Sequence, residues 1–506
     1  MTRKISEVAG LTMASRLLGL VRDILLFASL GTGPLNSAFI LAFTLPNLFR
    51  RLLGEGALTS SSIPILSESL EKRGNQETYS LLNAILSRLG IGLLGIQIIA
   101  IPIFFSVSRI PGLEERWYLG AELSQWLFPY MMLICLGALV CGMLNVLGRF
   151  GLTAFNQVWL NLAIISAILI GLWILPENGW GRVLLITGGV LVGGFFQLVV
   201  PAIGLMRSGW RPKINLQPHD DLGRVLALFL PGLLGAAIFQ VNILVSRFLA
   251  FSLDDTATGL LYLSSRLVEL PLGVFAIAVT TVIFPELSKL SATGEEKSFS
   301  ATFRRGIGLI FMITLPAALG LALLGDSILG FLFQWGLFES RDVADAYPVL
   351  IASAMGLPFF AWSSFLTRAW YARQEMKTPV RLAALNLVLN LVLGLILMQF
   401  LGAVGLALAN TISSVVHCLL LQAFLPGRPQ LAFSLNSLIS LLAGLAALAL
   451  ICIYGQSVLA SMDLASKVRD LLAIGLLIPL AAAAYFLILW CCRHPQLRQL
   501  VGGRKR

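Results

Sequence analysis

Long apolar runs, broken by short polar segments, occupy most of this sequence. An α-helix needs about 20 mostly apolar residues to cross the hydrocarbon core of a bilayer. The runs predict about fourteen such helices, at residues 8–30, 34–53, 80–107, 122–148, 154–175, 182–206, 224–250, 258–284, 305–334, 346–372, 380–400, 402–424, 435–456 and 470–492. Little more than Gly402 divides the eleventh run from the twelfth. The pattern therefore predicts an all-α polytopic membrane protein.

Composition agrees with this class. Hydrophobic residues make up 57% of the 506 residues and charged residues 12%, about half of the roughly 25% that soluble domains carry. This composition excludes a disordered chain, a nucleic-acid-binding protein and an ordinary cytosolic enzyme. The formal net charge of +11 is explained by cytoplasmic loops, where Lys and Arg are in excess. We therefore expect membrane lipids, and no nucleic acid, around this chain.

The distribution of Lys and Arg between alternate loops predicts the orientation. With the N-terminus inside, the inside segments hold twenty-two of these residues, and the outside segments hold six: Arg109, Arg116, Arg182, Arg341, Lys467 and Arg469. Because Lys and Arg favour the cytoplasmic side, we predict an even number of spans and two cytoplasmic termini.

A weak internal repeat predicts the domain organisation. Residues 22–68 and 247–289 align at an offset of 225 as far as Pro46 and Pro271, and after a four-residue gap Pro64 matches Pro285. Each copy holds a proline-bearing run after a short predicted outside loop. Repeats of this kind are typical of transporters. We predict an N-lobe at 1–220 with helices 1–6, a C-lobe at 221–430 with helices 7–12, and helices 13–14 with a basic cytoplasmic tail at 431–506.

Several ionisable residues fall inside or at the ends of the predicted spans. Such groups cost at least about 2.5–3.5 kcal/mol each at a helix centre, and they normally face a partner or a water-filled cavity. We single out five arginines and three acids: Arg16, Arg22, Asp23, Arg50, Arg51, Glu55, Arg266 and Glu269. Three further arginines within spans receive no role: Arg88, Arg247 and Arg368.

Two interpretations of these charges are open. In the first, Arg22–Asp23 and Arg266–Glu269 are structural ion pairs, while Arg50 and Arg51 extend to the cytoplasmic surface. In the second, the arginines line a cationic cavity for an anion, because the guanidinium fork matches phosphate oxygens. Since the bases come from both predicted lobes and outnumber the acids, we favour a diphosphate-binding cavity that includes Arg16, Arg22 and Arg266.

Residues typical of catalysis or metal binding form no recognisable pattern. We assign no catalytic or metal-binding role to His219, His417 or His494, and the six cysteines lie in or beside apolar runs without metal-ligand spacing. The sequence therefore predicts no enzyme activity, no cofactor and no metal. Glycines such as Gly188-Gly189 and Gly193-Gly194 predict close helix packing.

Short motifs follow one another from residue 15 to about 381. The first group is Ser15-Arg16-x-x-Gly19-x-x-Arg22-Asp23, Ala38-Phe39, Ala42-Phe43-x-Leu45-Pro46-Asn47-Leu48-x-Arg50-Arg51, Glu55-Gly56-Ala57 and Pro64-Ile65-Leu66. The second group is Arg266-Leu267-x-Glu269-x-Pro271-x-Gly273, Phe333-Gln334-x-Gly336-x-Phe338 and Tyr371-x-Arg373-Gln374-x-x-Lys377-Thr378-Pro379. In this order, the motifs resemble the MurJ (MviN) lipid II flippases.

The resemblance implies a fourteen-helix, two-lobe member of the superfamily of multidrug and polysaccharide exporters, in the bacterial inner membrane. The implied substrate is lipid II, the undecaprenyl-diphosphate-linked peptidoglycan precursor, moved from the cytoplasmic to the outer leaflet for cell-wall synthesis. Contact with the cell-wall synthesis machinery is a further expectation. The family's diphosphate-binding arginines match Arg16, Arg22, Arg50 or Arg51, and Arg266, with Asp23, Glu55 and Glu269 in supporting or gating positions.

This sequence departs from the family pattern at two places. An aspartate that is common in the family's second helix falls at Ser37, which puts in doubt a role of that acid in gating or proton coupling. Some members have a cation site with acids in the C-lobe, whereas the nearest candidates here are neutral: Asn242, Asn386, Asn390 and Thr411. We therefore expect transport to depend on membrane potential more than on sodium.

Other functions fit parts of this pattern. A MATE-like drug antiporter would need acids for a cationic drug, whereas bases outnumber acids in this chain. A flippase for another polyprenyl-diphosphate glycan would use the same cavity chemistry, so that only the motifs favour lipid II. A polytopic glycosyltransferase would need a catalytic cluster of acids or histidines, which the sequence does not show.

Overall fold

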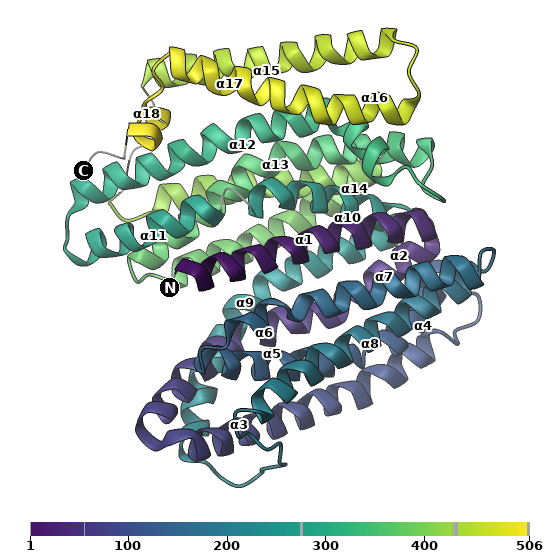
Figure 1. Cartoon of the computed structure of the whole chain (residues 1–506), viewed down its shortest axis with the longest axis vertical. Helices are drawn as coiled ribbons and strands as arrows, with labels where there is room; N and C mark the ends of the chain where they lie inside the picture. The colour runs from purple at the N-terminus through teal and green to yellow at the C-terminus, as the bar shows by residue number, and fades with distance from the viewer. Residues whose placement is uncertain (1, 55, 274–276, 428, 430–433, 503–506) are drawn as a thin grey trace. The chain divides into compact units, whose positions relative to one another are not determined.

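The computed structural model describes residues 2–54, 56–273, 277–427, 429 and 434–502, and within them every regular element is helical (Figure 1). The first half contains α1 (Thr2–Leu30), α2 (Pro34–Phe49), the π-helix η1 (Arg50–Gly54), α3 (Ala57–Val107), α4 (Glu115–Leu127), α5 (Tyr130–Val146), α6 (Phe150–Ala154), α7 (Asn156–Ile174), α8 (Gly179–Met206) and α9 (Asp220–Leu253). The second half contains α10 (Ala257–Pro271), α11 (Ile277–Ala292), α12 (Glu296–Phe333), α13 (Ser340–Ala372), α14 (Lys377–Phe424), α15 (Leu435–Ser461), α16 (Ser466–Leu472), η3 (Ala473–Leu477), α17 (Ile478–Cys491) and α18 (Pro495–Gly502).

The described residues include nine helical stretches that are long and apolar enough to cross a membrane, or ten if the bent pair α4–α5 forms one span. One stretch, Pro34–Val107, has 74 residues. At about 1.5 Å per residue it is several times longer than the hydrocarbon core is thick. Gly74 interrupts it with a φ of 80°, and Gly402 interrupts α14 with a φ of 57°. The all-α membrane class is confirmed, whereas the count of fourteen stays a prediction.

The chain forms two compact units by packing. Unit 1 is Met1–Gly259 with Trp335–Phe338, and unit 2 is Leu260–Gln334 with Glu339–Arg506. Helix α9 packs against α3 and so lies in unit 1, although the repeat assigns it to the C-lobe. The packing units and the repeat-based lobes are different divisions, and the lobe boundaries at 220 and 430 stay a prediction.

In unit 1, helices α7 and α8 lie side by side because small residues face each other (Figure 1). A Cβ at Gly189 would be 2.7 Å from the Cβ of Ala167, and a Cβ at Gly193 would be 2.9 Å from the Cα of Leu160. Without glycine at these positions the two backbones would have to separate. The predicted packing role of these glycines is therefore confirmed for Gly189 and Gly193.

Loops of unit 1 gather at two ends of its helices. At one end, Ser37 contacts Asp255, Leu35 lies against Gly179, and the Leu337 N–H donates to the Ala28 carbonyl at 2.9 Å. The loops at this end are those that the Lys and Arg distribution assigns to the outside. At the other end, the predicted inside segments meet around α3. Which end faces the cytoplasm stays a prediction.

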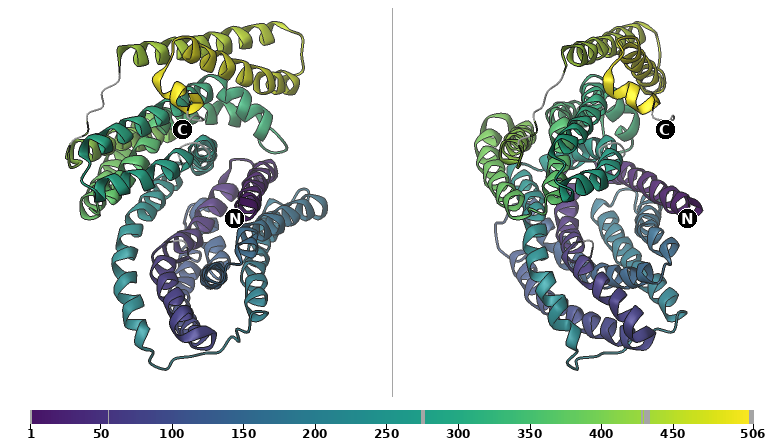
Figure 2. Two further views of the ribbon diagram at one scale, coloured as in Figure 1. Left: turned by 60° about the vertical axis from the view of Figure 1, so that its left-hand side comes forward. Right: turned by 90° about the vertical axis from the view of Figure 1, so that its left-hand side faces the viewer.

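In unit 2, helices α15 and α17 form an antiparallel pair that packs on α12 (Figure 2). A Cβ at Gly444 would be 2.8 Å from the Tyr485 ring, and the Tyr485 hydroxyl donates to the Met312 carbonyl at 2.7 Å. A buried aromatic cluster that includes Phe303 and Phe365 joins α12 to α13. The last two predicted spans are thus fixed to unit 2 by one buried tyrosine and by apolar packing.

Candidate functional site

Arg22 is at the centre of a buried polar cluster in unit 1. Its Nε and Nη2 donate to the same Asp23 oxygen, Oδ1, at 3.0 and 2.7 Å, and Nη1 donates to Asn161 Oδ1 at 3.1 Å. Asn161, on α7, in turn donates to the Ser15 carbonyl at 3.1 Å. Arg22 and Asp23 are both buried. The cluster therefore joins α1 to α7 and neutralises a charge that would be very costly alone.

Arg16 lies on the same helix but in a different environment. Its side chain is exposed, and in the described part of the chain no hydrogen bond or ion pair is found for it. Six residues separate it from Arg22, so the two project about 120° apart around the helix axis. The structure does not bring Arg16 into the Arg22 cluster. Because the Arg16 guanidinium stays in contact with solvent, it does not carry the desolvation cost that burial imposes on Arg22.

Arg50 and Arg51 begin the π-helix η1, where α2 changes its pitch after Pro46. Both are half-buried, and Arg50 Nε donates to Asn47 Oδ1 at 3.1 Å. A Cβ at Gly56 would lie 2.6 Å from the Arg51 carbonyl oxygen, so this backbone turn requires glycine. Glu55, the predicted gating acid between these segments, lies outside the described residues.

Ser37, at the position where the resemblance places an aspartate, is fully buried on α2. Its hydroxyl donates to the backbone carbonyl of Asp255 at 2.5 Å. A hydroxyl can donate this hydrogen bond, whereas an ionised carboxylate can only accept. Ser37 therefore fixes the loop between α9 and α10 to α2 in a way that an ionised aspartate could not.

Arg266 forms a second arginine–acid pair, in unit 2. Its Nη1 lies 3.0 Å from Glu269 Oε2, and its Nη2 donates to the Tyr262 hydroxyl at 2.9 Å. The guanidinium carbon is 4.9 Å from the Tyr262 ring centroid, a cation–π distance. The expected contact with Glu269 is present, while Tyr262 is a partner that the predicted site did not include. Tyr262 lies four residues before Arg266, and residues at this spacing are neighbours on a helix, so the contact could have been predicted from the sequence.

The neutral candidates for a cation site lie on two helices. Asn242 is half-buried on α9, while Asn386 and Asn390 are one turn apart on α14. Asn390 is buried, and the Oδ1 of Asn386 accepts no hydrogen bond among the described residues. No group of three or more His, Cys, Asp or Glu residues with metal-binding geometry occurs in that same part of the chain.

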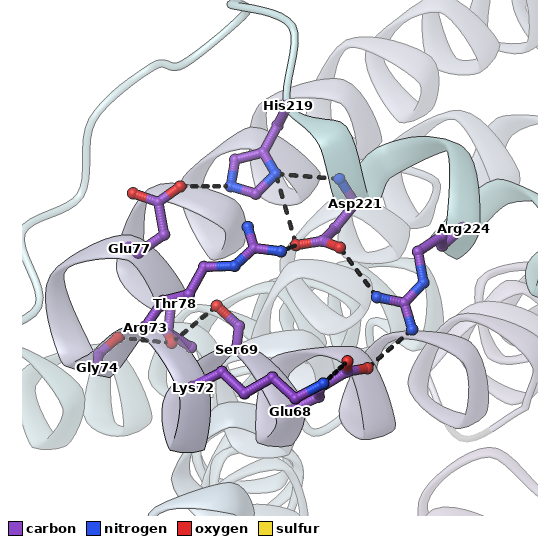
Figure 3. A network of polar contacts seen from close by, with 10 residues as sticks. All are labelled: Glu68, Ser69, Lys72, Arg73, Gly74, Glu77, Thr78, His219, Asp221 and Arg224. Carbon is purple, nitrogen blue, oxygen red and sulfur yellow. Dashed lines mark hydrogen bonds and ion pairs between the residues drawn. The ribbon is translucent and has the colours of Figure 1, made fainter.

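An ion-pair network, which we call the α3–α9 clasp, was not anticipated (Figure 3). It consists of Glu68, Lys72, Arg73, Glu77, His219, Asp221 and Arg224. The Asp221 carboxylate accepts from Arg73 at 3.0 Å and from Arg224 at 3.1 Å, and Arg224 also donates to Glu68 at 2.8 Å. His219 Nε2 lies 3.2 Å from Glu77 Oε1. The clasp holds the start of α9 against the bend of α3 at Gly74.

The extended segment 207–219 that precedes α9 is bound along α3. Arg88 Nη2 donates to the carbonyls of Leu216 and Gln217, both at 3.0 Å, and the Trp210 indole donates to Asn83 Oδ1 at 2.9 Å. The sequence assigned Arg88 no role, because its acceptors are backbone carbonyls, three of them about 128 residues away. Its role is to fix this connecting segment to unit 1.

Long apolar helices in both units define a polytopic helical membrane protein. Solved structures share the fold: a lipid II flippase MurJ in an inward closed conformation has a TM-score of 0.77 and 24% identity, over 95% of this chain and 97% of that one. An inward-facing multidrug resistance transporter of the MATE family has a TM-score of 0.67 and 17% identity, over 83% of this chain and 97% of that one.

Sequence comparisons define the family. The family model described as "Lipid II flippase MurJ" matches residues 27–477. A probable lipid II flippase MurJ of Vibrio cholerae is 33% identical over 430 residues, which cover 82% of this chain and 81% of the relative. One of Rhizobium tropici is 30% identical over 447 residues, covering 86% and 82%. The chain therefore belongs to the lipid II flippase MurJ family.

Proposed function

We propose that this chain moves lipid II, the undecaprenyl-diphosphate-linked peptidoglycan precursor, from the cytoplasmic to the outer leaflet. The match of residues 27–477 to the flippase family carries this proposal. The relatives named above are described as probable lipid II flippases, and the arginines of both units suit the substrate's anionic group. An antiporter for cationic drugs would instead need acidic residues in its binding site.

Arginine chemistry supports the way in which the head group would be held. We propose that Arg16, Arg266 and the Arg50–Arg51 pair donate to diphosphate oxygens, because a guanidinium offers paired donors to such an acceptor. Arg22 belongs to the same proposed set, and Asp23 and Asn161 orient its fork. Glu269 and Tyr262 orient Arg266 in the same manner.

The proposed transport step follows from the substrate's two parts. A charged, sugar-bearing head group cannot cross about 30 Å of hydrocarbon unaided, so protein donors replace its water while the isoprenyl tail remains in lipid. Movement of one lobe against the other would then expose the head group to alternate sides. The membrane potential acts on the cationic site with about 2.3 kcal/mol per charge per 100 mV, which we propose as the driving force for its return.

The remaining expectations belong to the same proposal. The chain would lie in the inner membrane with both termini in the cytoplasm, and cysteine labelling at position 116 should report the outside and at position 297 the inside. Release of the lipid at the outer leaflet would supply the enzymes that polymerise the glycan, so that contact with this machinery is expected there.

Depletion of the protein in cells, followed by a leaflet-access assay, tests the function. We expect depletion to trap lipid II in the cytoplasmic leaflet, and re-expression of the wild-type chain to release it. Measuring the leaflet access of another polyprenyl-diphosphate glycan in the same cells tests the alternative, in which the chain flips that lipid and not lipid II. Unchanged access of lipid II after complete depletion, with a different glycan lipid trapped instead, would contradict the proposed substrate.

A further inference from the structure

Arg182 is a buried cation for which the described part of the chain provides no acidic partner. It lies in the first turn of α8, its exposed fraction is 7%, and its Nε donates to no acceptor among the described residues. No carboxylate lies within ion-pair distance of it in that part of the chain. A buried, uncompensated charge is strongly unfavourable, so this guanidinium requires an anion.

Two glycines make room for the guanidinium. A Cβ at Gly171, in the last turn of α7, would be 3.3 Å from Arg182 Cγ, and a Cβ at Gly179 would be 4.0 Å from Arg182 Nη2. The side chain therefore extends back toward the start of its own helix, as side chains in a first turn do. The guanidinium therefore lies beside the N-terminus of α8.

Two helix N-termini meet at this position. Leu35 Cδ1, on the first turn of α2, would be 3.0 Å from a Cβ at Gly179, so the starts of α2 and α8 are adjacent. Each N-terminus carries about half a positive charge. In α8 the Gly181 N–H donates to Asn178 Oδ1 at 2.8 Å, which leaves the N–H groups of Gly179 and Trp180 without a partner in the helix, and α2 begins with Pro34, which has no N–H. Together with Arg182 the two N-termini concentrate positive charge, which the nearby C-terminal turn of α7 offsets only in part.

We propose that Arg182 and the adjoining N-termini of α8 and α2 form a binding site for a lipid-borne phosphate. Phosphate oxygens accept both from helix N-termini and from the guanidinium fork. The site lies at the end of unit 1 that is predicted to face the outside, away from the residues assigned to head-group binding. The phosphate comes either from the transported diphosphate after its passage or from an outer-leaflet phospholipid. The site does not depend on which lipid the chain transports.

Native mass spectrometry of the purified full chain tests this site, because it counts bound lipid molecules even when a second site is occupied. The probes are undecaprenyl diphosphate and phosphatidylglycerol, added separately. Arg182→Gln should weaken binding of one probe by about tenfold, the loss expected for a charge-assisted pair. Arg341→Gln is the matched control, because this side chain is 92% exposed, and it should bind both probes as the wild type does.

The probe that is lost identifies the source of the phosphate. Loss of undecaprenyl diphosphate assigns the site to the transported lipid, and loss of phosphatidylglycerol assigns it to the membrane. Removal of an unpaired buried charge should leave the melting temperature of the lipid-free protein unchanged or raised. Wild-type binding of both probes by Arg182→Gln, or a lowered melting temperature without a change in binding, would overturn the proposal.

Arg182→Lys keeps the test decisive if the glutamine variant fails to fold. Lysine preserves the charge but loses the paired donors, so we expect a folded protein with an intermediate loss of affinity for the same probe. A folded lysine variant with undiminished affinity for both probes would exclude a guanidinium–phosphate contact.

Discussion

The Arg22 and Arg266 sites share a sequence pattern, an arginine with an acid close by, but they have different physical environments. The Arg22 and Asp23 side chains are 8% and 4% exposed, whereas those of Arg266 and Glu269 are 33% and 51% exposed. Arg22 reaches another helix through Asn161, while the described polar contacts of Arg266 come from its own helix. The first site contributes to the packing of unit 1, and the second is open to solvent.

This difference predicts separate consequences of mutation. Removing one member of a buried pair leaves an uncompensated charge and typically costs about 3–5 kcal/mol. An exposed pair contributes about 0–1 kcal/mol. Loss of transport at the two sites would therefore differ in its main cause. At Arg22, misfolding would add to the loss of a proposed substrate contact, whereas at Arg266 the substrate contact alone would be lost.

Arg22→Ala should have the largest effect, because Asp23 would remain buried without its main partner. We expect a loss of about 3–5 kcal/mol of stability, poor accumulation in the membrane and no lipid II translocation. Thermal unfolding followed by size-exclusion chromatography measures the first two. Arg16→Ala is the matched control for stability and accumulation, both of which it should leave unchanged, since this arginine is exposed on the same helix. Normal accumulation of Arg22→Ala would contradict the view that Arg22, unlike Arg266, is needed for stability.

Arg266→Ala should abolish or severely reduce translocation while the protein accumulates normally, because the pair is exposed. Arg266→Lys should rescue transport only in part, since an ammonium keeps the charge but not the paired donors. A leaflet-access assay measures both. The double variant Arg266→Ala/Glu269→Ala separates the two interpretations. Normal flipping by it would show that the pair is structural and that Arg266 does not bind the diphosphate.

The α3–α9 clasp provides an intermediate case, because it combines a buried carboxylate with exposed ones. Asp221→Ala removes an acceptor that is 5% exposed, and it should lower stability by about 1–3 kcal/mol since Arg73 and Arg224 lose their shared partner. Glu68→Ala, in the same network, should lower the melting temperature much less, because the Glu68 side chain is 36% exposed. Equal losses for the two variants would show that exposure does not determine the contribution of these pairs.

Replacement of sodium should have the smallest effect. Because Asn242, Asn386 and Asn390 carry no charge, we expect flipping in vesicles to continue at the same rate when choline replaces sodium. Collapse of the membrane potential should stop it, since the cationic site responds to the field. A strict sodium requirement would show that the asparagines, or other residues of the chain, form a working cation site.

The all-α membrane class was predictable from the sequence, because the pattern of apolar runs is a local property. The Arg266–Glu269 contact was also predictable, since residues three apart on a helix are neighbours whatever the rest of the chain does. The close approach of α7 and α8 followed from Gly189 and Gly193 for a similar reason, as small residues mark helix contacts in membranes.

The tertiary structure alone determined which distant partner each polar residue finds. Arg22 and Asn161 are 139 residues apart, and Ser37 and Asp255 are 218 apart. Arg88 binds backbone carbonyls, which carry no side-chain signal. Arg182 looked like an ordinary loop charge until its burial was known. Such contacts depend on which helices pack together and in what register, and residue spacing along one helix contains no information about either.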